Sequence, residues 1–393
     1  MKKKNNILIF AKYFWPAFKA GGPVRSVLNL VQTLSNDYDF SIVSRDRDSG
    51  DRVSFPGIQV WNWNVKEHYR IFYSGIGKLK NCFTFVRIFF EEKPQILYIN
   101  SFFDPLFSIL PLFINMLFRK RAAVVLAPRG EFSEGALKIN PLRKKIYTWF
   151  FKRCFLKDII FHATSMMEQN DIHRQFGLTI KVEVVPNIVL LSDALVPRRN
   201  KKNNELSIVY LSRVSPKKNL LYALEILSQM KHGAICFDIW GYIDDQNYWR
   251  ECQLLIEKLP ANITAKYRGV VKHENVVEVL QRYHVFFLPT HGENFGHVIL
   301  EALYAGCLVL LSDQTPWLDL EELGIGWSIP LSKPEKFAQL INKLQQKDET
   351  FFNTFASFAR TYSLKKMRVT AAVLDGYHKI FRKDKCGQNN ISW

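Results

Sequence analysis

Short apolar runs alternate with helical patterns along almost the whole chain, and this alternation constrains the fold more than any other feature. In the first half, a strand-type run at 6–11 precedes 24–34, where apolar residues recur every three or four positions as in a helix. Further strand-type runs follow at 39–44, 95–100, 122–127 and 159–163. Apolar runs separated by helices predict a parallel sheet that is covered on both faces.

The same alternation begins again in the second half of the chain. Strands are predicted at 207–211, 236–240, 285–289 and 308–312, and helices at 220–231 and 297–305. Between the two series, residues 191–205 are polar and aperiodic, which is typical of a linker. We therefore predict an α/β protein with Rossmann-like domains at 1–190 and 206–365. A C-terminal helix and tail at 366–393 are expected to pack back on the first domain.

The positive charge is concentrated in the first half. Residues 1–200 contain 30 Lys and Arg against 16 Asp and Glu, a net charge of +14, whereas residues 201–393 contain 24 against 20, or +4. Such an excess predicts an anionic partner: phosphates, acidic polysaccharide, nucleic acid or an anionic membrane surface. Because no zinc-finger, helix-turn-helix or RNP-like pattern occurs, nucleic acid is not expected as the partner.

Cysteine usage and hydropathy indicate a cytoplasmic protein. The six Cys residues occur singly, without metal-type pairs, which predicts free thiols in a reducing compartment. The first residues lack the apolar core of a secretory signal. The apolar stretch 105–118 contains 14 residues and is too short to cross a bilayer, so it is expected to form a buried helix between strands.

Acidic residues follow one strand of the second series. Ligands of doubly wound sheets bind beyond the carboxyl ends of the strands. There, Glu293 lies in the loop and Glu301 about one turn into the next helix, while 294–296 offers backbone N–H groups at the helix N-terminus. A carboxylate in such a place holds a vicinal diol by two hydrogen bonds. Ordinary solvated charges near a helix start are the alternative.

Cations and glycines follow two other strands. Arg213, Lys217 and Lys218 come directly after 207–211. The planar fork of Arg and the point charge of Lys suit a diphosphate, although a solvated basic loop is the alternative. Gly21 and Gly22 lie between the first strand and the first helix, where the lack of a side chain allows a ligand to approach the backbone.

Together these segments resemble the retaining glycosyltransferases of family 4, which have the GT-B fold. The E-x7-E motif from Glu293 to Glu301, the segment LSRVSPKKNL and the N-terminal YFWPAFKAGGPVRSVLNL carry the resemblance, which extends over about 7–381. It implies two Rossmann-like domains that face each other across a cleft, with the acceptor bound by the first and the donor by the second. A nucleotide-sugar epimerase of the same architecture is the alternative.

The resemblance implies transfer of a sugar, as by a hexosyltransferase, from a nucleotide-diphosphate donor to a glycan or lipid-linked oligosaccharide in surface polysaccharide biosynthesis. Glu293 would hold the sugar hydroxyls, and Arg213 and Lys218 would neutralise the leaving diphosphate. The other implied donor contacts are Glu301 at the ribose, the backbone amides of Asn294, Phe295 and Gly296, the side chain of His297, and Gly21 and Gly22. For His297, a role as a structural helix cap is the alternative.

No metal and no other cofactor are expected, because family members usually need none. No Asp-x-Asp-like motif is recognised at a strand-to-helix junction, and Asp244-Asp245 is set aside as lacking that context. The chain departs from the family where many members carry a His near the end of an N-terminal strand. Arg129 and Glu131 occupy the comparable place and are candidate acceptor-side residues. An Arg129 that instead pins the interdomain hinge is the alternative.

The segment 138–157 mixes nine apolar or aromatic residues with seven cations. This composition fits a basic amphipathic helix on anionic lipid. We therefore hypothesise that the first domain docks peripherally on the inner face of the cytoplasmic membrane, where a lipid-diphosphate-linked acceptor is presented. A helix that packs its apolar side inward and solvates its cations is the alternative.

Overall fold

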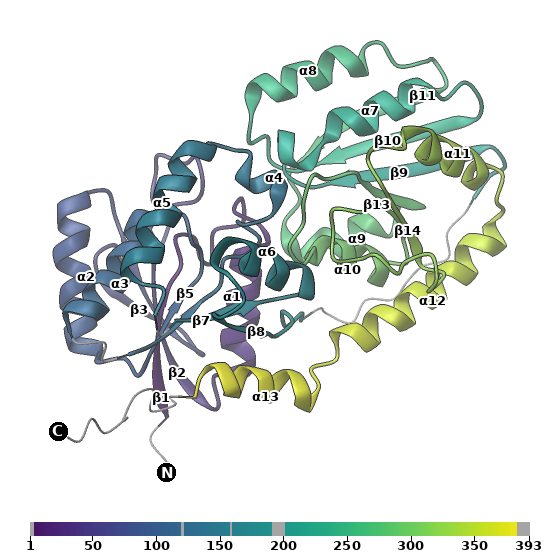
Figure 1. The fold of residues 1–393 in the computed structure, drawn as a ribbon. Helices are drawn as coiled ribbons and strands as arrows, with labels where there is room; N and C mark the ends of the chain where they lie inside the picture. The colour runs from purple at the N-terminus through teal and green to yellow at the C-terminus, as the bar shows by residue number, and fades with distance from the viewer. Residues whose placement is uncertain (1–3, 119–121, 158, 191–200, 383–393) are drawn as a thin grey trace. The chain divides into compact units, whose positions relative to one another are not determined.

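A computed structural model describes residues 4–118, 122–157, 159–190 and 201–382 (Figure 1). The chain divides into two compact units: 1–189 together with 369–393 (unit 1), and 190–368 (unit 2). Most of the predicted linker, 191–200, lies outside the described residues. The C-terminal helix belongs to unit 1, in which Tyr377 donates a hydrogen bond to the carbonyl of Pro186.

The described residues of unit 1 form an eight-stranded sheet in the order β3-β4-β2-β1-β5-β6-β7-β8. Only the pairing of β3 with β4 is antiparallel within this sheet. Its strands are β1 (Asn5–Phe10), β2 (Tyr38–Arg45), β3 (Trp63–Val65), β4 (Arg70–Ser74), β5 (Ile96–Ile99), β6 (Ala123–Leu126), β7 (Ile159–Ala163) and β8 (Lys181–Val184). Its helices are α1 (Gly22–Leu34), α2 (Lys78–Glu92), α3 (Leu110–Leu117), α4 (Glu134–Leu137), α5 (Pro141–Cys154), α6 (Met166–Phe176) and α13 (Ala371–Ile380).

Alternate residues of the central strands pack into two different hydrophobic cores of unit 1, one on each face of the sheet. In β1, Leu8 and Phe10 join the core under α2, α3, α5 and α6, whereas Ile7 and Ile9 join the core under α1 and α13. Successive side chains of a strand point to opposite faces of the sheet. A run in which every residue is apolar therefore forms a strand that is buried on both sides.

The described residues of unit 2 form a parallel six-stranded sheet in the order β11-β10-β9-β12-β13-β14. Its strands are β9 (Glu205–Leu211), β10 (Ala234–Trp240), β11 (Ile263–Gly269), β12 (Val285–Leu288), β13 (Leu308–Ser312) and β14 (Gly326–Ile329). Its helices are α7 (Leu220–Ser228), α8 (Gln246–Ile256), α9 (Val276–Leu280), α10 (His297–Tyr304), α11 (Pro334–Gln345) and α12 (Glu349–Met367). Short 3-10 turns, η2 (Pro216–Lys218) and η3 (His273–Asn275), precede α7 and α9.

The apolar stretch 105–118 forms a π-helical turn, η1 (Pro105–Ile109), which continues into α3 between β5 and β6. Only one side of this segment is buried, since Phe107 and Leu112 lie in the core while Phe113 and Leu117 face solvent. The expectation of a buried helix is therefore only half right. No helix in the described part of the chain is long and apolar enough to span a bilayer.

Phe102 lies at the centre of an aromatic cluster in unit 1 and is fully buried. Its ring centroid lies 4.6 Å from that of Phe151 and 4.7 Å from that of Phe132. Phe102→Ala should lower the free energy of unfolding by about 3–5 kcal/mol, because it leaves a cavity that the sheet cannot close. Phe83→Ala is the matched control, since its ring is 77% exposed and its loss should change stability by less than about 0.5 kcal/mol. Urea denaturation measures both, and equal losses would contradict the packing described.

Candidate active site

A largely buried ion pair joins the ends of two neighbouring strands in unit 2. Lys218 ends η2 after β9, and its ammonium contacts a carboxylate oxygen of Glu293 in the loop after β12. Strands β9 and β12 are direct neighbours and parallel, so their carboxyl ends lie at the same edge of the sheet. The sequence predicted both residues as catalytic, and the structure brings them into contact.

Burial alone would raise the pKa of Glu293, because a charged carboxylate is poorly solvated there. The charge and hydrogen bond of Lys218, helped by Lys217, outweigh burial and hold the pKa below its usual range. Glu293 is therefore a carboxylate at neutral pH and accepts hydrogen bonds only. One of these comes from the backbone N–H of Asn294, 3.3 Å from the second carboxylate oxygen.

The loop from Glu293 leads into α10 through a left-handed turn. Gly296 is the N-terminal cap of this helix and has a φ of 76°, which residues with a side chain rarely adopt. A Cβ at Gly296 would lie 2.5 Å from Ile299. Trp317 fixes the loop by donating its indole N–H to the carbonyl of Phe295 at 2.7 Å. The side-chain oxygen of Asn294 is buried without a hydrogen-bond partner among the described residues.

His297 and Glu301 both lie on α10 and are both buried. The His297 ring packs against Phe295, with the centroids 4.8 Å apart, which fits the structural-cap alternative as well as a donor contact. One carboxylate oxygen of Glu301 lies 3.5 Å from Nδ1 of His273 in η3. His273 was not predicted from the sequence.

Arg213 is less buried than Lys218 and has its own partner. Its guanidinium lies 3.3 Å from a carboxylate oxygen of Asp244, which follows β10. Gly241 lets the two loops cross closely, because a Cβ there would lie 1.8 Å from the carbonyl oxygen of Ser212. The loops after β9 and β10 therefore pack directly on each other and present the Arg213–Asp244 pair at the carboxyl edge of the sheet.

The interpretation of Asp244-Asp245 needs a correction. These residues do lie at a strand-to-helix junction, between β10 and α8. Asp245 caps α8 by accepting hydrogen bonds from the backbone N–H groups of Asn247 and Tyr248, both at 3.0 Å. Asp244 pairs with Arg213. Both carboxylates therefore interact with other residues of unit 2.

Gly21 and Gly22 lie at the carboxyl edge of the sheet in unit 1. Gly21 caps α1 with a φ of 73° and has open space where a Cβ would be. The buried carboxylate of Asp48 holds this loop by accepting from the backbone N–H groups of Phe18 and Lys19, at 2.7 and 2.9 Å. Asp48 thus fixes the conformation of this loop, and the ligand contact of Gly21 and Gly22 stays a prediction.

Arg129 is buried in unit 1 and donates to three neighbouring side chains. Its guanidinium bonds to Asn100 at 2.7 Å, to Asn187 at 2.8 Å and to the hydroxyl of Tyr98 at 2.7 Å. Asn187 lies two residues before the point where the chain leaves unit 1. This geometry fits the pinning alternative better than an acceptor contact, because the donors of Arg129 point to residues of its own unit.

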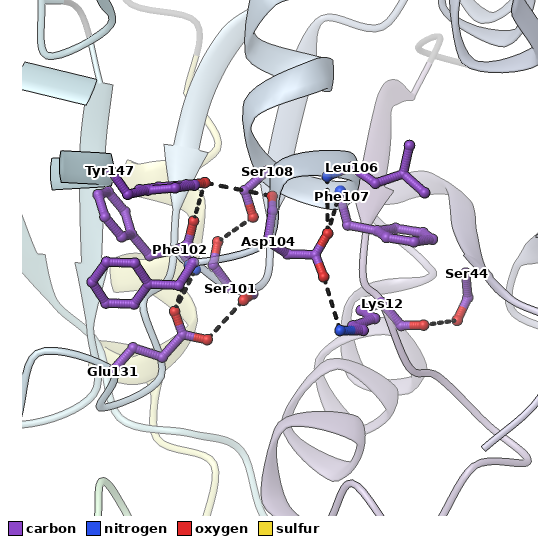
Figure 2. A network of polar contacts seen from close by, with 11 residues as sticks. Lys12, Ser44, Ser101, Phe102, Asp104, Leu106, Phe107, Ser108, Glu131 and Tyr147 are labelled. Atoms are coloured by element: carbon purple, nitrogen blue, oxygen red, sulfur yellow. Dashed lines mark hydrogen bonds and ion pairs between the residues drawn. The ribbon is translucent and has the colours of Figure 1, made fainter. Parts of the chain in front are cut away.

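Glu131 also forms its hydrogen bonds with residues of unit 1 (Figure 2). Its carboxylate accepts from the hydroxyl of Ser101 and from the backbone N–H groups of Phe102 and Phe103. Burial raises its pKa, and these hydrogen bonds oppose the rise. The same loop is held by Tyr147, whose hydroxyl donates to the carbonyl of Phe102 at a short distance (Figure 2). Glu131 therefore orders the loop after β5.

Solved structures with the same fold are glycosyltransferases of the GT-B class. Sucrose-phosphate synthase from Thermosynechococcus elongatus is 17% identical, with a TM-score of 0.72, over 96% of this chain and 99% of that one. Anabaena HepE in complex with UDP-glucose is 15% identical, with a TM-score of 0.69, over 95% and 98%. The two parallel-sheet units of the chain therefore have the GT-B fold.

Family models divide the chain at the same place as the fold. The model described as Glycosyltransferase Family 4 matches residues 20–192, and the model described as Glycosyl transferases group 1 matches 192–354. The gpi3 subunit of phosphatidylinositol N-acetylglucosaminyltransferase from Schizosaccharomyces pombe is 27% identical over 133 residues, which are 33% of this chain and 28% of that subunit. The chain is a glycosyltransferase and belongs to family 4.

The buried ion pair between Lys218 and Glu293 should contribute to the stability of unit 2. Lys218→Met should lower the free energy of unfolding by about 3–5 kcal/mol, because it leaves the carboxylate of Glu293 without its cation. Lys218→Met combined with Glu293→Gln should recover part of that loss, since no buried charge remains. Urea denaturation of the single and double variants measures the coupling. Additive losses would mean that the two residues do not form a pair.

Proposed function

We propose that the chain transfers a sugar from a nucleotide-diphosphate donor to a glycan or lipid-linked oligosaccharide acceptor, with retention of anomeric configuration and without a metal. The proposal depends above all on the buried contact between Lys218 and Glu293 at the carboxyl edge of the sheet in unit 2. This contact places a fixed cation and a fixed acceptor of hydrogen bonds at the N-terminus of α10.

Each group then has a role that follows from its chemistry. The ammonium of Lys218 and the guanidinium of Arg213 stabilise negative charge that grows on the leaving diphosphate. The carboxylate of Glu293 accepts hydrogen bonds from the sugar hydroxyls. Glu301 accepts from the two ribose hydroxyls, and the backbone N–H groups at the start of α10 bind the donor oxygens. UDP-glucose is the first donor to test, because HepE has been solved with it.

Retention follows if the acceptor attacks the face from which the diphosphate leaves. The bond between the anomeric carbon and the diphosphate oxygen breaks, and its electron pair stays on the diphosphate. The acceptor oxygen bonds to the anomeric carbon on the same face, and its proton passes to a leaving phosphate oxygen. Such a reaction needs no protein nucleophile, and the cations supply the electrostatic stabilisation.

Surface polysaccharide biosynthesis is the proposed setting, with the acceptor presented at the inner face of the cytoplasmic membrane. Helix α5 supports this placement, because it has five cations, no acidic residue and the exposed side chains of Leu142, Ile146 and Trp149. Gly21 and Gly22 offer backbone to the donor phosphates or the acceptor from unit 1. The epimerase alternative is not favoured, since both family models describe glycosyltransferases.

Donor binding should depend on Glu301. Wild-type protein screened with UDP-, GDP- and ADP-sugars should gain stability with one of them, by about 2.7 kcal/mol at a hundredfold excess over Kd. Glu301→Ala should abolish this gain, because the ribose loses its acceptor. Thermal shift measures the gain, with each variant's own unliganded melting temperature as the reference. Glu278→Ala, which removes an exposed Glu paired with Arg282, is the matched control.

An undiminished shift in Glu301→Ala would contradict the ribose role. The same screen tests metal independence, since EDTA should change neither the donor-induced shift nor the transfer rate. A requirement for added Mg²⁺ or Mn²⁺ would contradict that part of the proposal.

Asp244 should compete with the donor for Arg213. Asp244→Asn removes the carboxylate 3.3 Å from the guanidinium, so the nucleoside diphosphate should bind several-fold more tightly. Arg213→Ala should weaken binding, and adding Asp244→Asn to it should then have little further effect. Titration calorimetry with the nucleotide that the screen selects measures all three. Weaker binding by Asp244→Asn would show that Asp244 itself contacts the donor.

A further inference from the structure

Helix α2 of unit 1 has two apolar stripes, and only one of them faces the core. Phe85, Ile88 and Phe89 are buried under the sheet. The second stripe consists of Leu79, Phe83, Val86 and Phe90, spaced by four, three and four residues, and these side chains are all exposed. That spacing places them on one face of a helix. A surface helix of a soluble protein normally has charged or polar residues there.

Helix α3 continues this exposed apolar surface. Phe113, Met116 and Leu117 follow helical spacing and are exposed. The two helices are joined at Phe118, whose ring centroid lies 6.1 Å from that of Phe90. We call the seven side chains the α2–α3 face: Leu79, Phe83, Val86, Phe90, Phe113, Met116 and Leu117. Contiguous exposed apolar surface of this kind marks a contact with a protein or a membrane.

The exposed apolar residues are concentrated on one layer of unit 1. Helices α2, α3 and α5 pack on the same core cluster and so cover the same side of the sheet (Figure 1). On α5, Leu142, Ile146 and Trp149 form a third outward stripe at 60–70% exposure. In the described part of the chain, α1 and α13 on the opposite side expose no large apolar residue. The asymmetry indicates a single docking side.

We propose that the α2–α3 face inserts into the interfacial zone of an anionic lipid bilayer, next to the cationic contact made by α5. Charge favours lipid over a protein partner. Residues 105–157 contain eleven Lys and Arg against two Glu; among these, Arg129 is buried and Glu131 is partly buried. Apolar helical stripes with many cations and few acids fit anionic headgroups above acyl chains. This inference rests on the proposed function in one respect only, namely that a lipid-linked acceptor gives the protein a reason to bind the membrane.

Helices α3 and α5 are connected directly to the carboxyl edge of the sheet in unit 1 (Figure 2). Asp104 accepts hydrogen bonds from the backbone N–H groups of Leu106 and Phe107 at the start of η1, and its other oxygen lies 3.1 Å from the ammonium of Lys12 after β1. Tyr147 of α5 donates to Phe102 in the same loop. A bilayer that holds α3 and α5 therefore also holds the loop 101–108 beside its surface.

The test is sedimentation of the full chain with vesicles of equimolar phosphatidylcholine and phosphatidylglycerol, at low and high salt. The two contacts respond differently to salt. Salt screens the attraction between the α5 cations and the anionic headgroups, but it does not weaken the insertion of apolar side chains. The double variant Phe83→Asp with Phe90→Asp should bind at least about tenfold more weakly at both salt concentrations. Lys145→Glu with Arg153→Glu on α5 should weaken binding only at low salt.

Phe358→Asp is the matched control, because this ring is 64% exposed on α12 of unit 2 and should not affect vesicle binding. Vesicle binding by Phe83→Asp with Phe90→Asp equal to that of the wild type would overturn the proposal. So would a concentration-dependent dimer, seen without vesicles by analytical ultracentrifugation and abolished by the same pair, because a second copy would then cover the face.

The donor-induced thermal shift separates this inference from the proposed function. It should be unchanged in Phe83→Asp with Phe90→Asp, which also shows that the variant is folded. A wild-type protein that binds vesicles through the α2–α3 face and shows no shift with any nucleotide-sugar would contradict the proposed function alone.

Discussion

A strand buried on both faces tolerates a charge along its length only where that charge is paired, as Asp238 of β10 is with Arg268, and the rest of the structure depends on this constraint. In unit 2, β12 and β13 consist of buried residues without a single charge. The polar groups of the candidate site come where the strands end, with Arg213 after β9, Asp244 after β10 and Glu293 after β12. Because the strands are parallel, these ends meet at one edge. The fold thus gathers residues that are distant in the sequence into one site.

The same constraint explains which strands were predictable. The predicted strands match observed ones to within two residues at each end, because most of their residues are apolar. Five strands were missed: β3, β4, β8, β11 and β14. Four of these are the edge strands of the two sheets, and β4 lies next to an edge. Edge strands are covered less completely, so their sequences mix polar and apolar residues, as ITAKYRG does in β11.

Residues of the candidate site were predictable where a single short segment of the sequence contained the whole motif. Glu293, Gly296 and Glu301 belong to a single loop and helix, and Lys218 follows a clear strand. The partners of these residues were not predictable. Nothing local connects His273 with Glu301 or Asp244 with Arg213, since the members of each pair follow different strands. Arg129 shows the same limit, because only the fold brings Asn187 against it, 58 positions away in the sequence.

The α2–α3 face was hidden for a different reason. A helix with two apolar stripes has the same residue pattern as one that is buried on all sides, so the sequence of α2 alone cannot separate the two. The layer structure resolves this, because α2 has the sheet on one side only. An outward Phe83 contributes little to folding and adds apolar surface that favours aggregation. Four such residues form a stripe on α2, which continues on α3 and is bordered by cations. Packing within the protein does not account for this stripe, whereas contact with an apolar partner such as a bilayer does.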